Sequence, residues 1–415
     1  MFTIILAGGQ GQRLSPLTKD RSKSAVPFGG KYRIVDFVLS NCINSGLRQI
    51  AVLIQYRSSS LMHHIQEGWH ISLSGFGDEY IHCVPAQQKD GNYWYRGTAD
   101  AIRQNLDIIT AKKKDHTLIL SGDHIYKMNY DLMLDFHREH DADLTMAAVR
   151  VSQDVAMSMG VLEANQNWEM IGFEEKPAQP KTIDGDAERS LISMGVYIFK
   201  TSKLIEVLQR SHDDFGKDVI PYMQENNYKI FIYDYESRNR IRDYVAEVSD
   251  GVRHKVLVKK TRDSAYWRDV GNIESYYEAS MDLIGIEPSF NLYGEKWPFR
   301  TFQRELPPTK FVLGGMAQES ILSEGCIISG GSIWRSILSP EVIVEMEAVV
   351  EESILFDKVT VEPGAKVRRA IIDKGVTVCS GTRLGYDIEA DLARGCTVSQ
   401  GGIVVVPRDL TIGRC

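Results

Sequence analysis

Hydrophobic residues in the first two thirds of the chain alternate between short continuous runs and longer amphipathic stretches. The short runs predict buried strands at Thr3–Leu6, Ile50–Ile54, Thr117–Leu120 and Leu144–Val151. The stretches between them predict helices over Tyr32–Asn44, Leu61–Trp69, Thr98–Thr110 and Tyr130–His140. Strands that alternate with helices predict an α/β domain with a mostly parallel sheet. Such sheets bind ligands at the carboxyl ends of their strands, so the loops after Leu6 and Leu120 are the first candidates for a site.

The last hundred residues follow a different pattern, with an aliphatic residue at nearly every sixth position. The series runs through Ile321, Ile327, Ile333, Ile337, Ile343, Val349, Leu355, Val361, Val367, Ile372, Val378 and Leu384. This period predicts a parallel β-helix of hexapeptide repeats, in which each aliphatic side chain stacks inside a coil. A β-sandwich is the alternative, because its two-residue alternation also fits a period of six. Four prolines between residues 283 and 311 indicate a linker. We therefore predict three regions, 1–282, 283–311 and 312–415.

The composition argues against several classes of protein, namely nucleic-acid-binding, membrane and secreted proteins. The 415 residues carry 48 Lys and Arg against 55 Asp and Glu, a net charge of −7. With no basic excess to neutralise phosphates, we expect no nucleic-acid partner. No apolar run reaches the roughly 20 residues that span a bilayer, so we expect no membrane segment. Phe2–Ala7 lacks the basic flank of a secretory signal, and the six cysteines include no CxxC pair. We expect free thiols and a soluble, cytoplasmic protein.

A glycine-rich loop follows the first predicted strand, from Leu6 to Leu14. Its glycines, Gly8, Gly9 and Gly11, let backbone N–H groups approach a phosphate chain closely. Leu14 stands where a dinucleotide fingerprint needs a small residue, and no Gly-Lys-Ser/Thr follows to make a P-loop. Arg13 and Lys23 supply cations that suit a triphosphate. A plain turn with solvated basic residues is the alternative.

Two acids and one lysine are the other candidates for chemistry. Asp123 follows a predicted strand, and Asp269 lies in an aromatic and glycine-containing segment. Two carboxylates can hold Mg²⁺ while phosphate oxygens and water complete its ligands. Glu175 and Lys176 precede Pro177, and such a loop suits sugar hydroxyls and a monoester phosphate. The alternatives are an ordinary turn at Asp123, a salt bridge or helix cap at Asp269, and a solvated charge run around Lys176.

These segments together resemble the glucose-1-phosphate adenylyltransferases, also called ADP-glucose pyrophosphorylases, of bacterial type. The glycine loop alone marks sugar nucleotidyltransferases in general, whereas Trp94–Asp100 and Tyr266–Gly271 are more specific to the ADP-glucose enzymes. Further matches are Phe28–Asp36, Ser40–Gly46, Gly122–Lys127, Glu175–Pro177, Ser193–Gly195 and Asp214–Asp218. The resemblance implies a Rossmann-like nucleotidyltransferase domain followed by a left-handed parallel β-helix that serves oligomerisation and regulation.

The resemblance also implies a reaction and a set of site residues. Adenylyl transfer from ATP to α-D-glucose 1-phosphate would give ADP-glucose and pyrophosphate for glycogen synthesis, by in-line attack without a covalent enzyme intermediate. Asp123, Arg13 and Lys23 would be catalytic, and Asp123 and Asp269 would bind Mg²⁺. The implied nucleotide-binding residues are Leu6, Ala7, Gly8, Gly9, Gly11, Arg13, Gln88 and Gly97. The implied residues for glucose 1-phosphate and ADP-glucose are Tyr95, Gly160, Glu175, Lys176 and Ser193.

Family members are usually homotetramers under allosteric control by an anionic metabolite, and Arg21 and Arg33 are the candidates for that effector. Members that respond to fructose bisphosphate commonly have a lysine where this chain has Asp20. Because an acid there repels a phosphate, we expect a weak or altered response to fructose bisphosphate.

Two alternatives share the predicted fold. One is a sugar nucleotidyltransferase that uses another nucleotide, which Trp94–Asp100 and Tyr266–Gly271 disfavour. The other is a non-catalytic regulatory subunit. Such a subunit would be expected to lack the catalytic acids or phosphate-binding cations, whereas Asp123, Asp269, Arg13 and Lys176 are all present.

Overall fold

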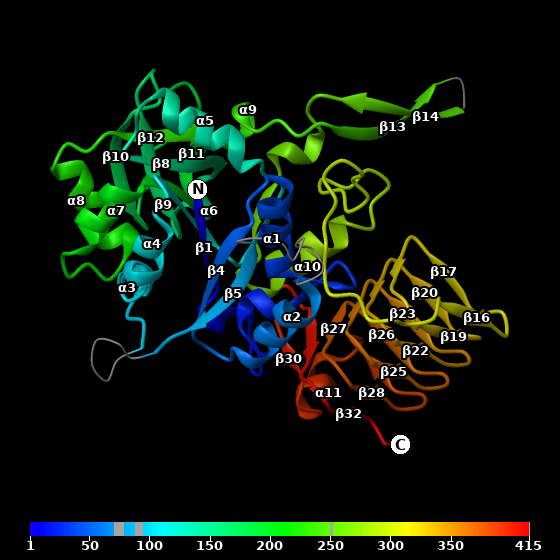
Figure 1. Cartoon of the computed structure of the whole chain (residues 1–415). Coiled ribbons are helices and arrows are strands. Elements are labelled where there is room, and N and C mark those ends of the chain that lie inside the picture. Colours follow the sequence, from blue (N-terminus) through cyan, green and yellow to red (C-terminus); the bar gives the residue numbers. More distant parts are fainter. Residues whose placement is uncertain (70–78, 88–93, 250–251, 415) are drawn as a thin grey trace.

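The amino-terminal strands form the sheet that the hydrophobic runs predict. The computed structural model describes residues 1–69, 79–87, 94–249 and 252–414. Within these residues, nine strands form one mixed sheet in which β4, β1 and β6 are central parallel neighbours (Figure 1). The antiparallel β11 follows β6 in the sheet. The strands are β1 (Phe2–Leu6), β4 (Gln49–Ile54), β5 (Tyr80–Pro85), β6 (His116–Ser121), β8 (Leu144–Ser152), β9 (Gly160–Ala164), β10 (Met170–Glu175), β11 (Arg189–Lys200) and β12 (Ile230–Asp234).

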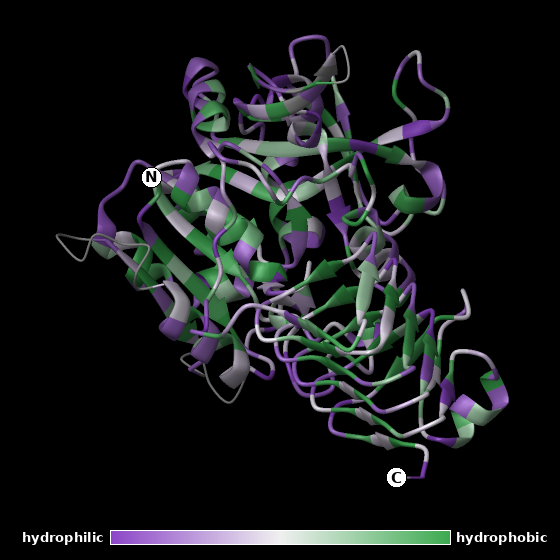
Figure 2. Cartoon of the chain, turned by 90° about the vertical axis from the view of Figure 1, so that its right-hand side faces the viewer, coloured by the Kyte–Doolittle hydropathy of each residue, from purple (hydrophilic) through white to green (hydrophobic). Residues whose placement is uncertain are grey.

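Helices cover both faces of this sheet and bury two separate apolar clusters. The first cluster includes residues of α1 (Ile34–Asn44), α2 (Ser59–Trp69) and α5 (Tyr130–Glu139). The second includes residues of α3 (Thr98–Arg103), α4 (Leu106–Lys112), α7 (Thr201–Leu208) and α8 (Ile220–Glu225). Figure 2 shows hydrophobic residues concentrated along the strands between these helices. The predicted α/β architecture is therefore confirmed.

Two predicted helices differ from the structure in instructive ways. Tyr32–Arg33 is the short strand β3, which pairs with β2 (Pro27–Phe28), so the first helix begins only at Ile34. The helix predicted over Thr98–Thr110 breaks into α3 and α4. At the break, the Asn105 side-chain amide donates to Ala101 O at 2.8 Å, while the Asn105 backbone N–H donates to Ile102 O. The side chain of Asn105 thus binds the carbonyl of Ala101, which the backbone N–H of Asn105 would bind if the α-helix continued.

Short elements complete the α/β domain and position its acids. The important pair is β7 (His124–Tyr126) with β15 (Trp267–Asp269), in which Asp269 lies opposite His124. A hairpin of β13 (Asp243–Ser249) and β14 (Val252–Val258) extends away from the sheet (Figure 1). The remaining elements are α6 (Gln153–Ala156), the π-helix Phe215–Val219, α9 (Tyr235–Arg238), α10 (Ile273–Asp282) and 3-10 turns at Gln12–Leu14, Lys23–Ala25 and Arg262–Ala265.

The carboxyl-terminal region is the predicted parallel β-helix, in which three sheets of short strands stack coil upon coil. The first sheet is β16 (Lys310–Val312), β19 (Ile327–Ser329), β22 (Ile343–Val344), β25 (Thr360–Val361), β28 (Thr377–Val378) and β32 (Thr411–Ile412). The second is β17 (Met316–Gln318), β20 (Ser332–Trp334), β23 (Val349–Glu351), β26 (Lys366–Arg368) and β29 (Arg383–Leu384). The third is β18 (Ile321–Leu322), β21 (Ile337–Leu338), β24 (Ile354–Leu355), β27 (Ala370–Ile372), β31 (Val404–Val406) and β30 (Thr397–Val398). Helix α11 (Ile388–Ala393) interrupts the last coils.

The interior of the β-helix corrects the phase of the predicted repeat. At several predicted positions, the residue that stacks in the interior is the next one along the chain. Val344 is buried in place of Ile343, and Val350 in place of Val349. Leu355 and Val361, by contrast, are interior as predicted. Pairs of adjacent aliphatic residues make either phase compatible with the sequence, so the fold was predictable and the exact stack was not.

The two regions pack through the linker and α10. Trp297 is buried and its indole N–H donates to Asn41 Oδ1 at 3.0 Å, while Tyr277 OH donates to Glu352 O at 2.6 Å. An apolar cluster joins loops of the α/β domain, α10, the linker and the outer face of the β-helix. The segment between Asp282 and Lys310 is therefore a packed strap along both regions.

Two sequence expectations concern the whole chain. Among the described residues, no helix has the length and hydrophobicity to cross a membrane. Cys42, Cys83, Cys326 and Cys396 are free thiols, but Cys379 is disulfide-bonded. The expectation that the cysteines are all free is therefore wrong at Cys379.

Candidate functional site

A cavity of about 550 Å³ opens at the carboxyl ends of β1, β4 and β6. These strands are neighbours in the sheet, so the residues that follow them meet at one edge. Gly122 N–H donates to Leu6 O at 2.9 Å and ties the loop before Asp123 to the end of β1. The predicted residues that line the cavity are Leu6, Gly8, Gly9, Arg13, Lys23, Tyr95, Gly97, Asp123, Gly160, Glu175, Lys176 and Asp269. The fold thus brings together predicted residues from distant segments of the sequence.

Two glycines near the cavity, one in the glycine loop and one before α3, lie where a side chain would not fit. Gly11 has a φ of +64°, and a Cβ there would come 3.0 Å from Lys23 Cβ. At Gly97, which precedes α3, a Cβ would come 2.2 Å from Asp213 O. Because these residues lack a side chain, the glycine loop can lie against Lys23, and the start of α3 can lie against the loop before the π-helix.

The two acids converge because β7 and β15 are paired. Lys23 Nζ donates to Asp123 Oδ2 at 3.0 Å and to Asp269 Oδ1 at 2.6 Å. Burial opposes the ionisation of Asp123, but the positive charges of Lys23 and His124 and a hydrogen bond from Ser121 outweigh it and lower the pKa of Asp123. Burial would also lower the pKa of Lys23, but the two carboxylates raise it. Lys23 therefore bridges the two carboxyl groups, and its positive charge helps to keep Asp123 ionised.

His124 adds a third side chain to this cluster, which the sequence analysis did not assign. Ligand atoms of Asp123, His124 and Asp269 all lie within 4.8 Å of one another. The oxygen donors of the two acids suit Mg²⁺, which takes carboxylate oxygens together with water and phosphate oxygens. The residues present therefore fit the expected metal, with Asp123 and Asp269 as its protein oxygen ligands.

The opposite wall of the cavity carries the residues expected at the sugar phosphate. Gly160 and Glu175 are paired across β9 and β10, and a Cβ at Gly160 would meet Glu175 Oε2 at 3.0 Å. Lys176 has a φ of +52°, an unusual conformation for a residue with a side chain. Its side chain is 58% exposed, and its Nζ lies 3.1 Å from Glu175 Oε1. The wall thus offers a cation and an acceptor close together.

Some predicted residues lie outside the cavity lining. Ala7 and Gly11 belong to the glycine loop without lining the cavity, and Ser193 Oγ lies 3.1 Å from the hydroxyl of Tyr197, which lines it. Gln88 lies outside the described residues. Tyr197 and Gln55 line the cavity and were missed, although Gln55 is the first residue after β4 and its position at a strand end was a usable signal.

The segment Asp214–Gly216 also lines the cavity, and the sequence analysis assigned it no role. Asp214 Oδ1 accepts from the backbone N–H groups of Gly216 and Lys217, and Thr98 Oγ1 donates to Asp214 Oδ2 at 3.1 Å. This carboxylate thus links the start of α3 to the segment beside Glu175. The π-helix that it caps is itself a rare element, often found at functional sites.

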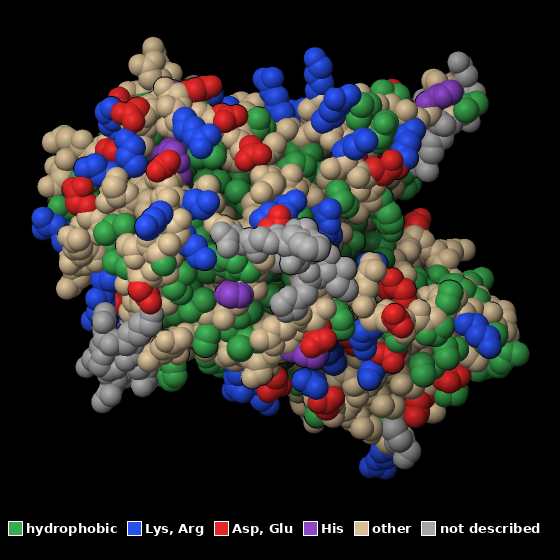
Figure 3. Space-filling view, viewed as in Figure 1, with side chains coloured by type: hydrophobic (Ala, Val, Ile, Leu, Met, Phe, Trp, Pro, Cys, Tyr) green, Lys and Arg blue, Asp and Glu red, His purple; other side chains and the backbone are tan. Residues whose placement is uncertain are grey.

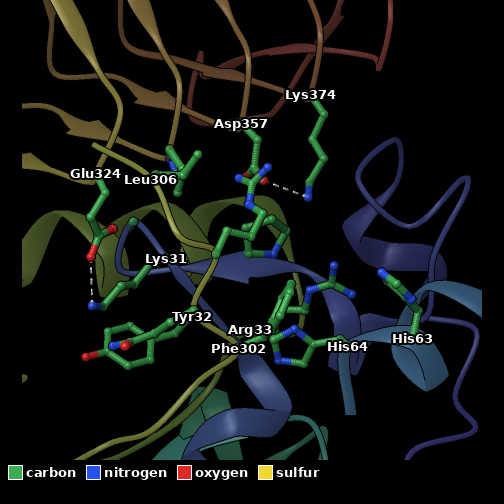
Figure 4. Close-up of a pocket in the computed structure, with 15 residues that line it drawn as sticks. Lys31, Tyr32, Arg33, His63, His64, Phe302, Leu306, Glu324, Asp357 and Lys374 are labelled. Carbon is green, nitrogen blue, oxygen red and sulfur yellow. Dashed lines mark hydrogen bonds and ion pairs between the residues drawn. The ribbon is translucent and has the colours of Figure 1, made fainter. Parts of the chain in front are cut away.

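A second cavity, of about 210 Å³, lies between the α/β domain, the linker and the β-helix (Figure 4). Four cationic side chains line it, together with two histidines, against only two acids. They are Lys31, Arg33, Arg304, Lys374, His63, His64, Glu324 and Asp357. Burial, outweighing the attraction of Asp357, and the nearby positive charges of Arg33 and Arg21 lower the pKa of Lys374. An anion bound here would relieve that repulsion.

The two predicted effector residues have different positions. Arg33 lines the second cavity and donates from Nη1 to Ser60 O at 2.7 Å. Arg21 is buried, with a side chain 3% exposed, and makes a two-pronged ion pair with Asp373 of the β-helix at 2.8 and 2.9 Å. The guanidinium of Arg21 is therefore occupied in joining the two regions, and the geometry gives it no surface for an effector.

Comparison with known proteins agrees with this architecture. The family described as "Nucleotidyl transferase" matches residues 2–285, and the family described as "GlmU-like, C-terminal hexapeptide" matches residues 307–406. The glucose-1-phosphate adenylyltransferase of Anaeromyxobacter sp. (strain Fw109-5) is 44% identical over 426 residues, covering 99% of each chain. That of Anaeromyxobacter dehalogenans (strain 2CP-C) is 46% identical, covering 99% of this chain and 98% of its own. That of Rhodopirellula baltica is 44% identical, covering 98% of this chain and 89% of its own. By identity and by coverage, this chain belongs to the glucose-1-phosphate adenylyltransferase family.

Proposed function

We propose that the protein transfers the adenylyl group of ATP to α-D-glucose 1-phosphate, giving ADP-glucose and pyrophosphate for glycogen synthesis. The observation that carries this proposal is the single cavity, which joins a glycine loop and two acids on one side to Glu175 and Lys176 on the other. A nucleotide and a sugar phosphate can lie there together, so their reacting atoms can meet without a covalent enzyme intermediate.

Each part of the cavity has a role in this reaction. The backbone of Gly8 and Gly9 and the guanidinium of Arg13 bind the triphosphate, and Lys23 neutralises charge that develops toward the leaving pyrophosphate. Lys176 binds the phosphate of glucose 1-phosphate and Glu175 accepts from sugar hydroxyls. The phosphate oxygen then attacks the α-phosphorus in line. Mg²⁺ held by Asp123 and Asp269 would supply further neutralisation of the phosphate charge.

The test of this activity is pyrophosphate release from purified protein with Mg²⁺ and glucose 1-phosphate, comparing ATP, UTP, GTP and dTTP. We expect a clear preference for ATP. Preference for another nucleotide would contradict the proposed substrate. Release with none of them would favour the regulatory-subunit alternative.

The second cavity supports an anionic metabolite as effector, bound by Arg33 and Lys374. Its excess of cationic side chains would attract a phosphate group, and its walls come from both regions, so a ligand would alter how they pack. We expect Lys374→Gln to weaken the response of the activity to inorganic phosphate and phosphorylated metabolites while leaving activity without effector intact. An unchanged dose response would exclude this cavity. Fructose bisphosphate should be a weak effector, because Asp20 replaces a base.

The open end of the β-helix supports a contact between two copies of the chain, which the expected homotetramer would require. Among the described residues, β16, β17 and β18 each lie at the end of a sheet with one edge unpaired. Hydrophobic side chains gather over this end (Figure 3), including Phe311, Leu313 and Met316, with Leu313 69% exposed. Stacking against a second copy would cover both features. We expect Leu313→Asp to reduce the mass measured by light scattering, whereas Leu392→Asp, at an exposed position on α11, should not. An unchanged mass for Leu313→Asp would exclude this surface.

A further inference from the structure

Lys23 lies between the two acids that are expected to bind the metal. Its Nζ is 3.0 Å from Asp123 Oδ2 and 2.6 Å from Asp269 Oδ1, and the side chain is almost completely buried. Two carboxylates whose oxygens lie within 4.8 Å of each other repel unless a cation separates them. In this arrangement the ammonium of Lys23 supplies that cation.

An ammonium in this position and a divalent metal ion on the same two carboxylates would repel each other strongly over a short distance. A metal that binds Asp123 and Asp269 therefore has to displace the amine. We propose that Lys23 is an internal counter-cation that competes with the metal for Asp123 and Asp269, and that nucleotide binding removes this competition.

The glycine loop gives the displaced amine a second partner. Lys23 Cβ lies against Gly11, so closely that a Cβ added to Gly11 would be 3.0 Å from Lys23 Cβ. Arg13 and Lys23 line the same cavity as Gly8 and Gly9. Because the four-carbon side chain of lysine is flexible, the amine can turn from the carboxylates to a triphosphate on the loop without a movement of the backbone. This second step rests on the proposed function, since it requires ATP at the loop.

The consequence is a positive coupling between the two ligands. ATP that draws Lys23 away leaves Asp123 and Asp269 free for the metal, and metal that displaces Lys23 leaves the amine free for ATP. By linkage, each ligand then raises the affinity of the other by the same factor. Without nucleotide, the protein should bind the metal weakly, because the ammonium of Lys23 occupies the space between the two acids.

The first test measures Mn²⁺ binding to the free protein, without nucleotide, by electron paramagnetic resonance. We expect Lys23→Gln to bind Mn²⁺ about tenfold or more tightly than the unaltered protein, because the competing charge is gone. Lys23→Arg keeps the charge and should bind as weakly as the unaltered protein. Lys23→Gln/Asp269→Asn should lose the gain. Equal affinity of Lys23→Gln and the unaltered protein, or tight binding by Lys23→Arg, would overturn the proposal. Lys23→Met removes the same charge and replaces Lys23→Gln if that variant does not fold.

The second test measures ATP binding by calorimetry with EDTA present. We expect Asp269→Asn to bind metal-free ATP several-fold more tightly than the unaltered protein, because Lys23 loses one of its two competing partners. Lys23→Gln should bind ATP more weakly. An Asp269→Asn variant with no gain in ATP affinity would overturn the proposed exchange. Failure to bind ATP with or without Mg²⁺ would instead contradict the proposed function, and the Mn²⁺ titration would still decide the role of Lys23.

Discussion

The α/β domain and the β-helix differ in how their strands are arranged and in where their polar residues gather. In the α/β domain, buried hydrophobic strands end abruptly at glycines and charged residues, and the ends of neighbouring strands meet at one cavity. In the β-helix, the strands are only two or three residues long, and each coil repeats the one below it around an apolar interior. Chemistry therefore collects where many different strands end together, whereas the repeat supplies a stable surface for contacts with the rest of the chain.

This difference predicts that substitutions in the two regions separate activity from stability. Asp123→Asn should lower turnover by on the order of 10³-fold, because it removes a carboxylate that would hold the Mg²⁺ that neutralises the reacting phosphates. The fold should survive, since Lys23 keeps Asp269 as a partner at 2.6 Å. Steady-state kinetics and thermal unfolding on the same preparation check both statements. Near-normal turnover would remove Asp123 from its proposed role.

The matching change in the β-helix is Leu355→Ala. Leu355 is fully buried in the interior stack, so its truncation should cost about 2–5 kcal/mol of unfolding free energy. Turnover per folded molecule should change little. Denaturant unfolding measures the loss, with Leu392→Ala on exposed α11 as the control. A large fall in turnover at full folding would break the separation between the two regions.

Lys176→Ala should have a smaller effect within the cavity. The amine is exposed and pairs with the neighbouring residue Glu175, so its loss should leave stability unchanged. The KM for glucose 1-phosphate should rise about tenfold to a hundredfold, because a charge-assisted hydrogen bond to the phosphate is lost. Substrate titration at saturating ATP checks this, with Lys181→Ala, which is exposed and outside the cavity lining, as control. An unchanged KM would count against the contact.

The smallest expected effect concerns acid stability. Burial, with the positive charges of His116 and Lys200, lowers the pKa of His137 to about 3. The unfolded chain binds a proton near its ordinary pKa of about 6.5, so this contribution to stability is full above that pH and falls as the pH drops toward 3. The loss by pH 5 is at most about 2 kcal/mol. Since no histidine follows His254 in the sequence, the β-helix lacks this liability.

Unfolding of the unaltered protein and of His137→Asn, measured between pH 7 and pH 5, checks this effect. The variant keeps a polar side chain beside Thr145, with which His137 Nδ1 shares a hydrogen bond of 2.8 Å. Its stability should depend less steeply on pH. An equal dependence of unfolding free energy on pH in the two proteins would show that His137 does not cause the loss of stability at low pH.

Much of the site was predictable because strand ends are visible in the sequence. Asp123 follows an unbroken hydrophobic run, and fold rules alone place it in the ligand crevice. Asp269 is different, because only the pairing of β15 with β7 brings it to Asp123, and that pairing depends on tertiary structure. The resemblance supplied what local pattern could not.

Other features depend on packing that no local pattern reveals. The break between α3 and α4 arises from one side-chain hydrogen bond of Asn105, and a periodic helical pattern continues across it. The buried pair of Arg21 with Asp373 joins residues 352 positions apart in the sequence. The resemblance therefore made Arg21 and Arg33 equal candidates for the effector, and only the structure separates them, because Arg21 pairs with Asp373 whereas Arg33 lines a cavity.

The central claim is that both substrates occupy one cavity and react directly. The most direct test is exchange of labelled pyrophosphate into ATP with purified protein and Mg²⁺, with and without glucose 1-phosphate or ADP-glucose. Direct transfer predicts exchange only when the sugar substrate is present, because pyrophosphate can reform ATP only from ADP-glucose. Exchange with ATP and pyrophosphate alone would reveal an adenylylated enzyme and would contradict the account.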